Sequence, residues 1–198
     1  MTSRARGSLS ATAPVDEAMS EVTAGLDTDR NSPDEEGELI FSSFTNDDAW
    51  ALGHDMRNAA REGQLPVCID IRRANGTELF HVSLLGATVD NDEWAKKKAA
   101  VVLRFEESSA RFGERYAAAP AHPALAAWVD MNRFAPVGGA FPVRVIGAGV
   151  VAAVSVSGLT GDGDHEFVVS AIRTFLRRTV RVAAPGEIRT TTVGHNAG

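Results

Sequence analysis

The stretch that decides the fold is Val67-Cys68-Ile69-Asp70-Ile71-Arg72, followed after Asn75-Gly76 by Leu79-Phe80-His81-Val82-Ser83-Leu84. Apolar and polar residues alternate in both halves, which is typical of strands with one buried face. Asn-Gly is the preferred pair for a two-residue turn between antiparallel strands. The stretch therefore predicts a β-hairpin.

The turn also predicts which residues lie opposite each other, because turn type and loop length set the register of a hairpin. Counting outward from Asn75-Gly76 puts Ile69 opposite Val82 on an apolar face. The other face is predicted to hold three pairs, Arg72 with Leu79, Cys68 with Ser83, and Asp70 with His81.

Asp70 and His81 are the main candidates for a functional site. Directly opposed residues have Cβ atoms about 4.5–5.5 Å apart, so the carboxylate is expected to hydrogen-bond the imidazole and fix its tautomer. A histidine oriented in this way can serve as a metal or haem ligand, or as a general base. A purely structural cross-strand charge pair gives the same pattern, and both interpretations stay open.

A second hairpin is predicted after Gly138-Gly139, with strands over residues 141–146 and 150–157. With Ala148-Gly149 as the turn, its apolar residues share one face. If both hairpins join one sheet, the second face is too polar for a core and suits a ligand cleft, an oligomer interface or solvent. That face would carry Asp70, Arg72, His81, Ser83, Arg144, Ser155 and Ser157.

Helices are predicted around these hairpins from helical periodicity and capping residues. The first begins near Thr45 or Asn46 and ends at Gly63. The second begins at Asp90, which has capping-box spacing with Glu93, and runs to Tyr116. A short helix covers residues 122–134, and the last begins at Asp164. This order predicts an α/β fold of the α+β type, with one antiparallel sheet built from two hairpins and flanked by helices.

Two further residues outside the hairpins are candidates for ligand binding. Lys98 falls on the apolar stripe of the second helix, where it either extends to water or is a buried ammonium that meets an anionic ligand or Asp70. His165 lies in the first turn of the last helix, as a capping or interface residue or as an axial ligand of haem iron.

Composition and charge limit the functional classes. The 198-residue chain has a formal net charge of −6, which argues against a general nucleic-acid partner. Its single cysteine, Cys68, fits a reducing compartment, and the start of the chain has no apolar segment typical of a secretory signal. The longest apolar run, residues 147–156, is too short to span a membrane as a helix. We therefore expect a cytoplasmic protein with no membrane partner.

Residues 1–37 and 183–198 are polar and aperiodic, which predicts two disordered tails around a single domain at residues 38–182. The sequence holds no nucleophile elbow, HExxH, CxxCH or paired catalytic carboxylates, so it identifies no catalytic residue. The sequence also does not identify a metal ion that the protein would bind.

Six segments of the sequence form a recognisable combination. They are Ile69-Asp70-Ile71-Arg72, Leu79-Phe80-His81, Asp90-Asn91-Asp92-Glu93-Trp94, Gly138-Gly139-Ala140-Phe141-Pro142-Val143-Arg144-Val145, Val154-Ser155-Val156-Ser157-Gly158-Leu159 and Asp164-His165-Glu166. Together they resemble the haem-degrading domain family, which includes HbpS-like, GlcG-like and PduO C-terminal-like domains, and in particular its uncharacterised-protein-family branch. The resemblance covers about residues 38–180.

The resemblance implies a profilin-like sheet flanked by helices and homo-oligomers built from dimers. Together with the polar sheet face, it favours a binding protein for haem or a small anionic ligand, with haem as the one candidate cofactor that the resemblance names. One alternative is a protein-interaction or chaperone-associated scaffold, because a eukaryotic member is linked to the delivery of tail-anchored membrane proteins. A second alternative is an enzyme of haem breakdown. The expected ligand-binding residues are Asp70, Arg72, His81, Lys98, Arg144 and His165.

Overall fold

The computed structural model describes residues 35–118 and 129–183, which belong to one compact unit. The predicted domain start at residue 38 lies at the end of a short helix, α2 (Glu35–Glu38). Most of the predicted tails, residues 1–34 and 184–198, lie outside the described residues.

The centre of the unit is a five-stranded sheet in the order β1-β4-β5-β2-β3. The two predicted hairpins are β2 (Cys68–Arg73) with β3 (Glu78–Ser83), and β4 (Ala140–Val145) with β5 (Gly149–Ser157). They join through an antiparallel β2–β5 pairing, which confirms the α+β class and the single sheet. The sequence did not predict β1 (Ile40–Phe41), a two-residue strand that pairs in parallel with β4.

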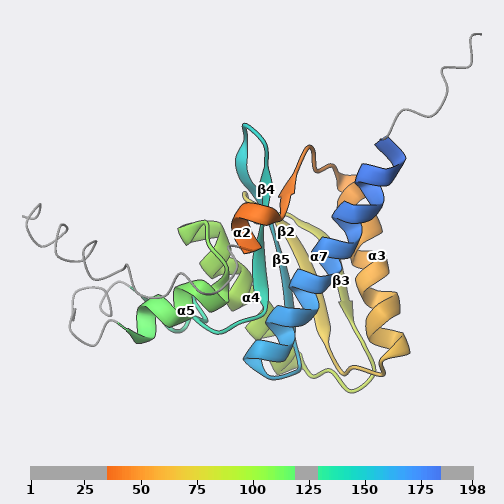
Figure 1. Ribbon diagram of the computed structural model, residues 1–198. Coiled ribbons are helices and arrows are strands. Elements are labelled where there is room, and N and C mark those ends of the chain that lie inside the picture. Colours follow the sequence, from red (N-terminus) through yellow and green to blue (C-terminus); the bar gives the residue numbers. More distant parts are fainter. Residues whose placement is uncertain (1–34, 119–128, 184–198) are drawn as a thin grey trace, which may run out of the picture. The chain divides into compact units, whose positions relative to one another are not determined.

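Helices cover both faces of the sheet (Figure 1). On the apolar face lie α3 (Asn46–Glu62) and α7 (Gly161–Ala183), whose buried residues form the main core with the sheet. On the other face α4 (Val89–Phe105) packs Ala99 and Val102 against Ala140 and Ala153. The second face is therefore a mixed one, with an apolar contact under α4 and polar residues beside it.

The first hairpin keeps the predicted register over most of its length. Ile69 pairs with Val82, Cys68 with Ser83, and Asp70 with His81, as expected. The prediction for Arg72 was wrong, because the register shifts after Ile71 and Arg72 lies opposite Glu78 rather than Leu79. The loop causes the shift. The Arg73 N–H donates to the Thr77 carbonyl, so the loop contains three residues, 74–76, instead of two, and its last residue, Gly76, has a φ of 86°.

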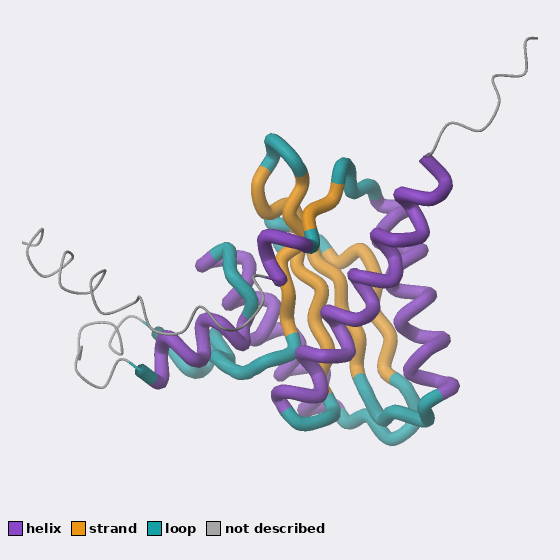
Figure 2. The backbone as a smooth tube through the Cα atoms, in the orientation of Figure 1, coloured by secondary structure: helices purple, strands orange, loops and turns teal. Residues whose placement is uncertain are grey.

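The second hairpin separates its two faces as predicted, with Phe141, Val143 and Val154 in the core. Its turn was placed wrongly: Val145 pairs with Gly149, so the loop is residues 146–148 rather than Ala148-Gly149. From Ala140 to Val143 every pairing moves by two residues, so the faces are unchanged there because side chains alternate with a period of two. The pairings of Arg144 and Val145 move by three, because the register shifts after Val143. Figure 2 shows this loop as the tip of the β4–β5 hairpin.

Several helices begin or end at other residues than predicted. Thr88 and Asn91 form the capping box of α4, two residues before the predicted Asp90–Glu93 box. The predicted helix from 90 to 116 is two helices, because Glu106 adopts a left-handed conformation (φ 57°) and Ser108 caps α5 (Ser109–Ala117). The last helix, α7, begins at Gly161, three residues before Asp164. Of the predicted helix over 122–134, residues 122–128 lie outside the described residues and residues 131–133 form a turn.

Candidate functional site

The candidate site is built around Asp70, in the middle of β2, which is fully buried although it is an acid. Arg72 is two residues further along the strand and therefore on the same face. Its Nη2 donates to Asp70 Oδ2 at 2.8 Å, and its Nε lies 2.7 Å from Oδ1. The same Nη2 donates to Glu78 at 2.9 Å. Burial raises the pKa of Asp70, and the hydrogen bonds and charges of Arg72 and His81 oppose this rise.

His81 lies between two carboxylates. Its Nδ1 is 3.1 Å from Asp70 Oδ2, and its Nε2 is 3.4 Å from Oδ1 of Asp92, in the first turn of α4. The predicted cross-strand contact of Asp70 with His81 is thus present. The His81 side chain is 29% exposed, so solvent reaches the ring while its Nδ1 is held from the buried side. A neutral imidazole in this position donates to Asp70 through Nδ1 and leaves the Nε2 lone pair for another partner.

Sequence reasoning missed two acids of this site, Glu78 beside Arg72 and Asp92 beside His81. For Asp92 the contacts extend further. Its Oδ1 accepts a hydrogen bond from Ser83 Oγ at 2.6 Å, and the carboxylate also accepts one from the Cys68 thiol. These two hydrogen bonds hold the pKa of Asp92 below its usual value. One feature of the sequence could have indicated Asp92: the helix that follows Ser83 begins with several aspartates. Because the connection between strand and helix is short, the first turn of the helix lies close to the end of the strand.

Cys68 lies at the base of the same group. Burial first, and then the negative charge and hydrogen bonding of Asp92, raise the pKa of its thiol to about 12. At neutral pH the thiol is therefore protonated and donates to Asp92. Cys68, His81 and Asp92 come from β2, β3 and α4, and their potential ligand atoms all lie within 4.8 Å of one another.

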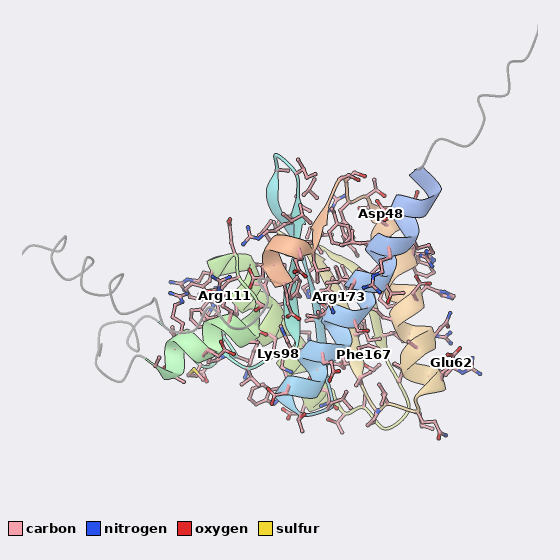
Figure 3. The ribbon with its side chains drawn as sticks, in the orientation of Figure 1. Asp48, Glu62, Lys98, Arg111, Phe167 and Arg173 are labelled. Carbon is pink, nitrogen blue, oxygen red and sulfur yellow. The ribbon has the colours of Figure 1, made fainter. Side chains whose placement is uncertain are left out.

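Lys98 lies elsewhere, in a buried ion pair with Asp164. Its Nζ donates to Asp164 Oδ2 at 2.7 Å and to the Val156 carbonyl at 3.2 Å. Figure 3 labels Lys98 near the start of α7, which carries Asp164. Lys98 is thus a buried ammonium, which is one of the two predicted alternatives, but its partner is Asp164 rather than Asp70. Asp164 is also not the first residue of α7; its other oxygen accepts from the Leu159 N–H at 3.0 Å.

Gly139 makes room for this buried pair. It has φ +125°, and a Cβ at this position would lie 2.6 Å from the Val156 carbonyl oxygen and 2.7 Å from Lys98 Nζ. Both the backbone angle and the space therefore require glycine. The lysine, which belongs to the layer on one side of the sheet, thus reaches Asp164 in the layer on the other side.

Arg144 and His165 contact α2 rather than the Asp70 group. The His165 Nε2 is 3.2 Å from Glu35 Oε2, and Arg144 Nη2 is 3.7 Å from Glu36 Oε2. Of the six predicted ligand-binding residues, the structure brings together only Asp70, Arg72 and His81. Within residues 35–118 and 129–183, no helix is both long enough and apolar enough to cross a membrane.

The comparison with known proteins identifies the family. A family model described as haem degrading protein HbpS-like matches residues 44–173. The UPF0303 protein SCO2848 of Streptomyces coelicolor is 46% identical over 143 residues, which cover 72% of this chain and 90% of the relative. A UPF0303 protein of Burkholderia thailandensis, BTH_I2506, is 44% identical over 138 residues, or 70% of this chain and 83% of the relative.

Solved structures agree with this result. The crystal structure of the Ybr137w protein superposes with a TM-score of 0.68 at 30% identity, covering 83% of this chain and 96% of that one. The crystal structure of HbpS gives a TM-score of 0.56 at 25% identity, covering 70% of this chain and 94% of that one. With its five-stranded sheet between helical layers, the chain belongs to the haem-degrading HbpS-like family, in the branch of the UPF0303 proteins.

Proposed function

We propose that this protein is a cytoplasmic, homo-oligomeric binding protein for haem or another small anionic ligand, and that the ligand contacts His81. The observation that carries the proposal is the orientation of His81: a buried carboxylate holds Nδ1, while the ring is partly exposed and Nε2 faces away from Asp70. A hydrogen bond from a carboxylate to one imidazole nitrogen orients the ring and makes the other nitrogen a better iron ligand. The family's haem-related description supports the choice of haem.

The surrounding charges define how a ligand would bind. Asp92 lies 3.4 Å from Nε2, a longer contact than the 3.1 Å between Asp70 and Nδ1, so a haem iron bound at Nε2 would take the place of Asp92 while Asp70 would still orient the ring. The Arg72 side chain is 19% exposed and is held by Asp70 on the same strand face as His81, so its guanidinium is a positive charge that a propionate would meet. Lys98 is occupied by Asp164 and is not available for this role.

Titration with haemin tests the proposal. We expect purified protein to shift and sharpen the Soret band of haemin, and His81→Ala to abolish this change. His54→Ala is the matched control, because His54 is an exposed histidine on α3, outside this site. Equal spectra for His81→Ala and the unaltered protein would reject His81 as the ligand. An unchanged free-haemin spectrum at protein excess would reject haem binding altogether.

A protein-interaction scaffold is the second candidate, because large apolar side chains are exposed around the β3–α4 connection. Leu85 is 99% exposed and Val89 79% exposed. Two large, exposed apolar side chains in one connection are candidates for an association surface, which also fits the proposed homo-oligomer. Size-exclusion chromatography with light scattering tests the oligomer: we expect Leu85→Ser with Val89→Ser to reduce the mass, and an unchanged mass would exclude this surface.

Oxidative haem breakdown, the remaining alternative, requires a reductant and dioxygen in addition to binding. Loss of Soret absorbance in haem-loaded protein after ascorbate is added in air would favour it. A stable spectrum would leave binding as the function.

A further inference from the structure

We propose that Cys68, His81 and Asp92 form a binding site for a divalent transition-metal ion of the zinc type. The site lies on the sheet face opposite the main core, where β2 and β3 meet the first turn of α4. Its potential ligand atoms, the Cys68 sulfur, a His81 ring nitrogen and an Asp92 carboxylate oxygen, lie within 4.8 Å of one another. Thiolate, imidazole and carboxylate are together the donor set of zinc and not of magnesium or calcium, which take oxygen ligands.

The hydrogen bonds at Asp92 show how a metal ion would fit. The carboxylate accepts from the Cys68 thiol, and its Oδ1 lies 3.4 Å from His81 Nε2. A metal ion would replace the thiol hydrogen between Cys68 and Asp92, and all three ligand atoms would then point at the ion. Binding would release the thiol proton to solvent and leave a thiolate, a carboxylate and a neutral imidazole around the ion, with no net charge for a divalent ion.

The orientation of His81 supports this assignment independently. Its Nδ1 contacts the buried Asp70 at 3.1 Å, which makes Nε2 the ligating atom. A carboxylate behind a metal-bound histidine is the usual arrangement around protein zinc, because it fixes the tautomer and increases the basicity of the ligand. The exposed sides of His81 and Asp92 leave a fourth position for water or an exogenous ligand.

A second set of candidate ligands, Asp70, Glu78 and His81, also lies close together. In this set the positive charge of the Arg72 side chain already pairs with both acids. The Arg72 guanidinium donates to both Asp70 and Glu78, at 2.8 and 2.9 Å. Among the described residues, no lysine or arginine forms an ion pair with Asp92. Electrostatics therefore favours the Cys68 set for a metal ion.

Titration of chelator-treated protein with Co²⁺, without haemin, tests the proposal. We expect one Co²⁺ per chain with a thiolate-to-cobalt charge-transfer band in the near ultraviolet. Cys68→Ser should remove the band, and Asp92→Asn should weaken the affinity by at least about tenfold. Glu93→Gln is the matched control, because it removes the neighbouring acid of the same helix turn, which pairs with Lys96 at the surface. Equal affinities for Asp92→Asn and Glu93→Gln would overturn the site.

X-ray absorption of the zinc-loaded, unaltered protein gives a result that does not depend on the folding of any variant. We expect a coordination shell with one sulfur at about 2.3 Å and the remainder nitrogen or oxygen. A shell of nitrogen and oxygen alone would exclude Cys68 and overturn the proposal. Neither measurement contains haem, so each can succeed or fail whatever the haem titration shows, although zinc and a haem iron would compete for the same His81 Nε2.

Discussion

Replacing Lys98 by methionine is expected to destabilise the fold while leaving the His81 site unchanged. The Lys98 and Asp164 side chains are 4% and 2% exposed, and their ion pair of 2.7 Å connects α4 to α7. Methionine keeps much of the length of lysine, so the main change is the loss of the charge. Asp164 then stays buried, and among the described residues its side chain keeps only the Leu159 N–H, at 3.0 Å, as a hydrogen-bond partner.

The expected cost follows from the penalty for a buried charge without a counterion. Removing one partner of a buried pair costs about 3–5 kcal/mol. Since the Leu159 N–H still satisfies part of the carboxylate, we expect about 3 kcal/mol, which corresponds to a fall in Tm of roughly 6–12 °C for a domain of this size. Urea unfolding followed by circular dichroism measures this change. Lys96→Met on the exposed surface of the same helix is the control and should leave the midpoint nearly unchanged.

A double-mutant cycle separates the ion pair from general packing. Asp164→Asn keeps an acceptor oxygen for the Leu159 N–H but removes the charge. The double variant should therefore be more stable than the sum of the two single effects predicts, by about 1–3 kcal/mol. Strict additivity, or a loss below about 1 kcal/mol for Lys98→Met, would refute the reasoning.

Two further predictions concern stability. Gly139→Ala should lower the free energy of unfolding in urea by on the order of 3 kcal/mol, because Gly139 has a φ of +125° and the Val156 carbonyl oxygen would lie 2.6 Å from the new Cβ. Gly147→Ala is the control: its φ is +73° and the space around it is open, so it should cost much less. Equal losses for the two variants would contradict this explanation. The pKa of Cys68 rises from 9.0 to about 12 on folding, so above pH 9 the unfolded chain releases a proton that the folded chain keeps. In chelator-treated protein, stability should therefore fall relative to Cys68→Ser by about 1.4 kcal/mol per pH unit between pH 9 and 12, and parallel pH profiles would exclude this linkage.

The first hairpin could be predicted from sequence because its information is local. Alternation fixes the faces and the turn fixes the register, so the contact of Asp70 with His81 followed from counting residues. The error at Arg72 arose because a three-residue loop ending in glycine and a two-residue Asn-Gly turn look alike in sequence. The bulge brings Arg72 opposite Glu78, and this second acid is what places one guanidinium between two carboxylates.

The rest of the site depends on contacts between distant segments, which periodicity does not encode. Lys98 and Asp164 are 66 residues apart, and nothing in either helix indicates that they meet. Asp92 was recognised as part of a helix start, but its side chain serves Ser83 and Cys68 instead of the helix end. Arg144 was assigned to the polar face by alternation, yet it lies near the sheet edge and contacts Glu36.

The four-residue helix α2 has a practical consequence for anyone who shortens this protein. Glu36 accepts the Ser108 N–H at the start of α5, and Glu35 contacts both His165 and Arg173 of α7. Both acids precede the family-matched region, which begins at residue 44. A recombinant fragment trimmed to that region would also lose Leu39 and Phe41 from the core, so expression plasmids should start upstream of residue 35.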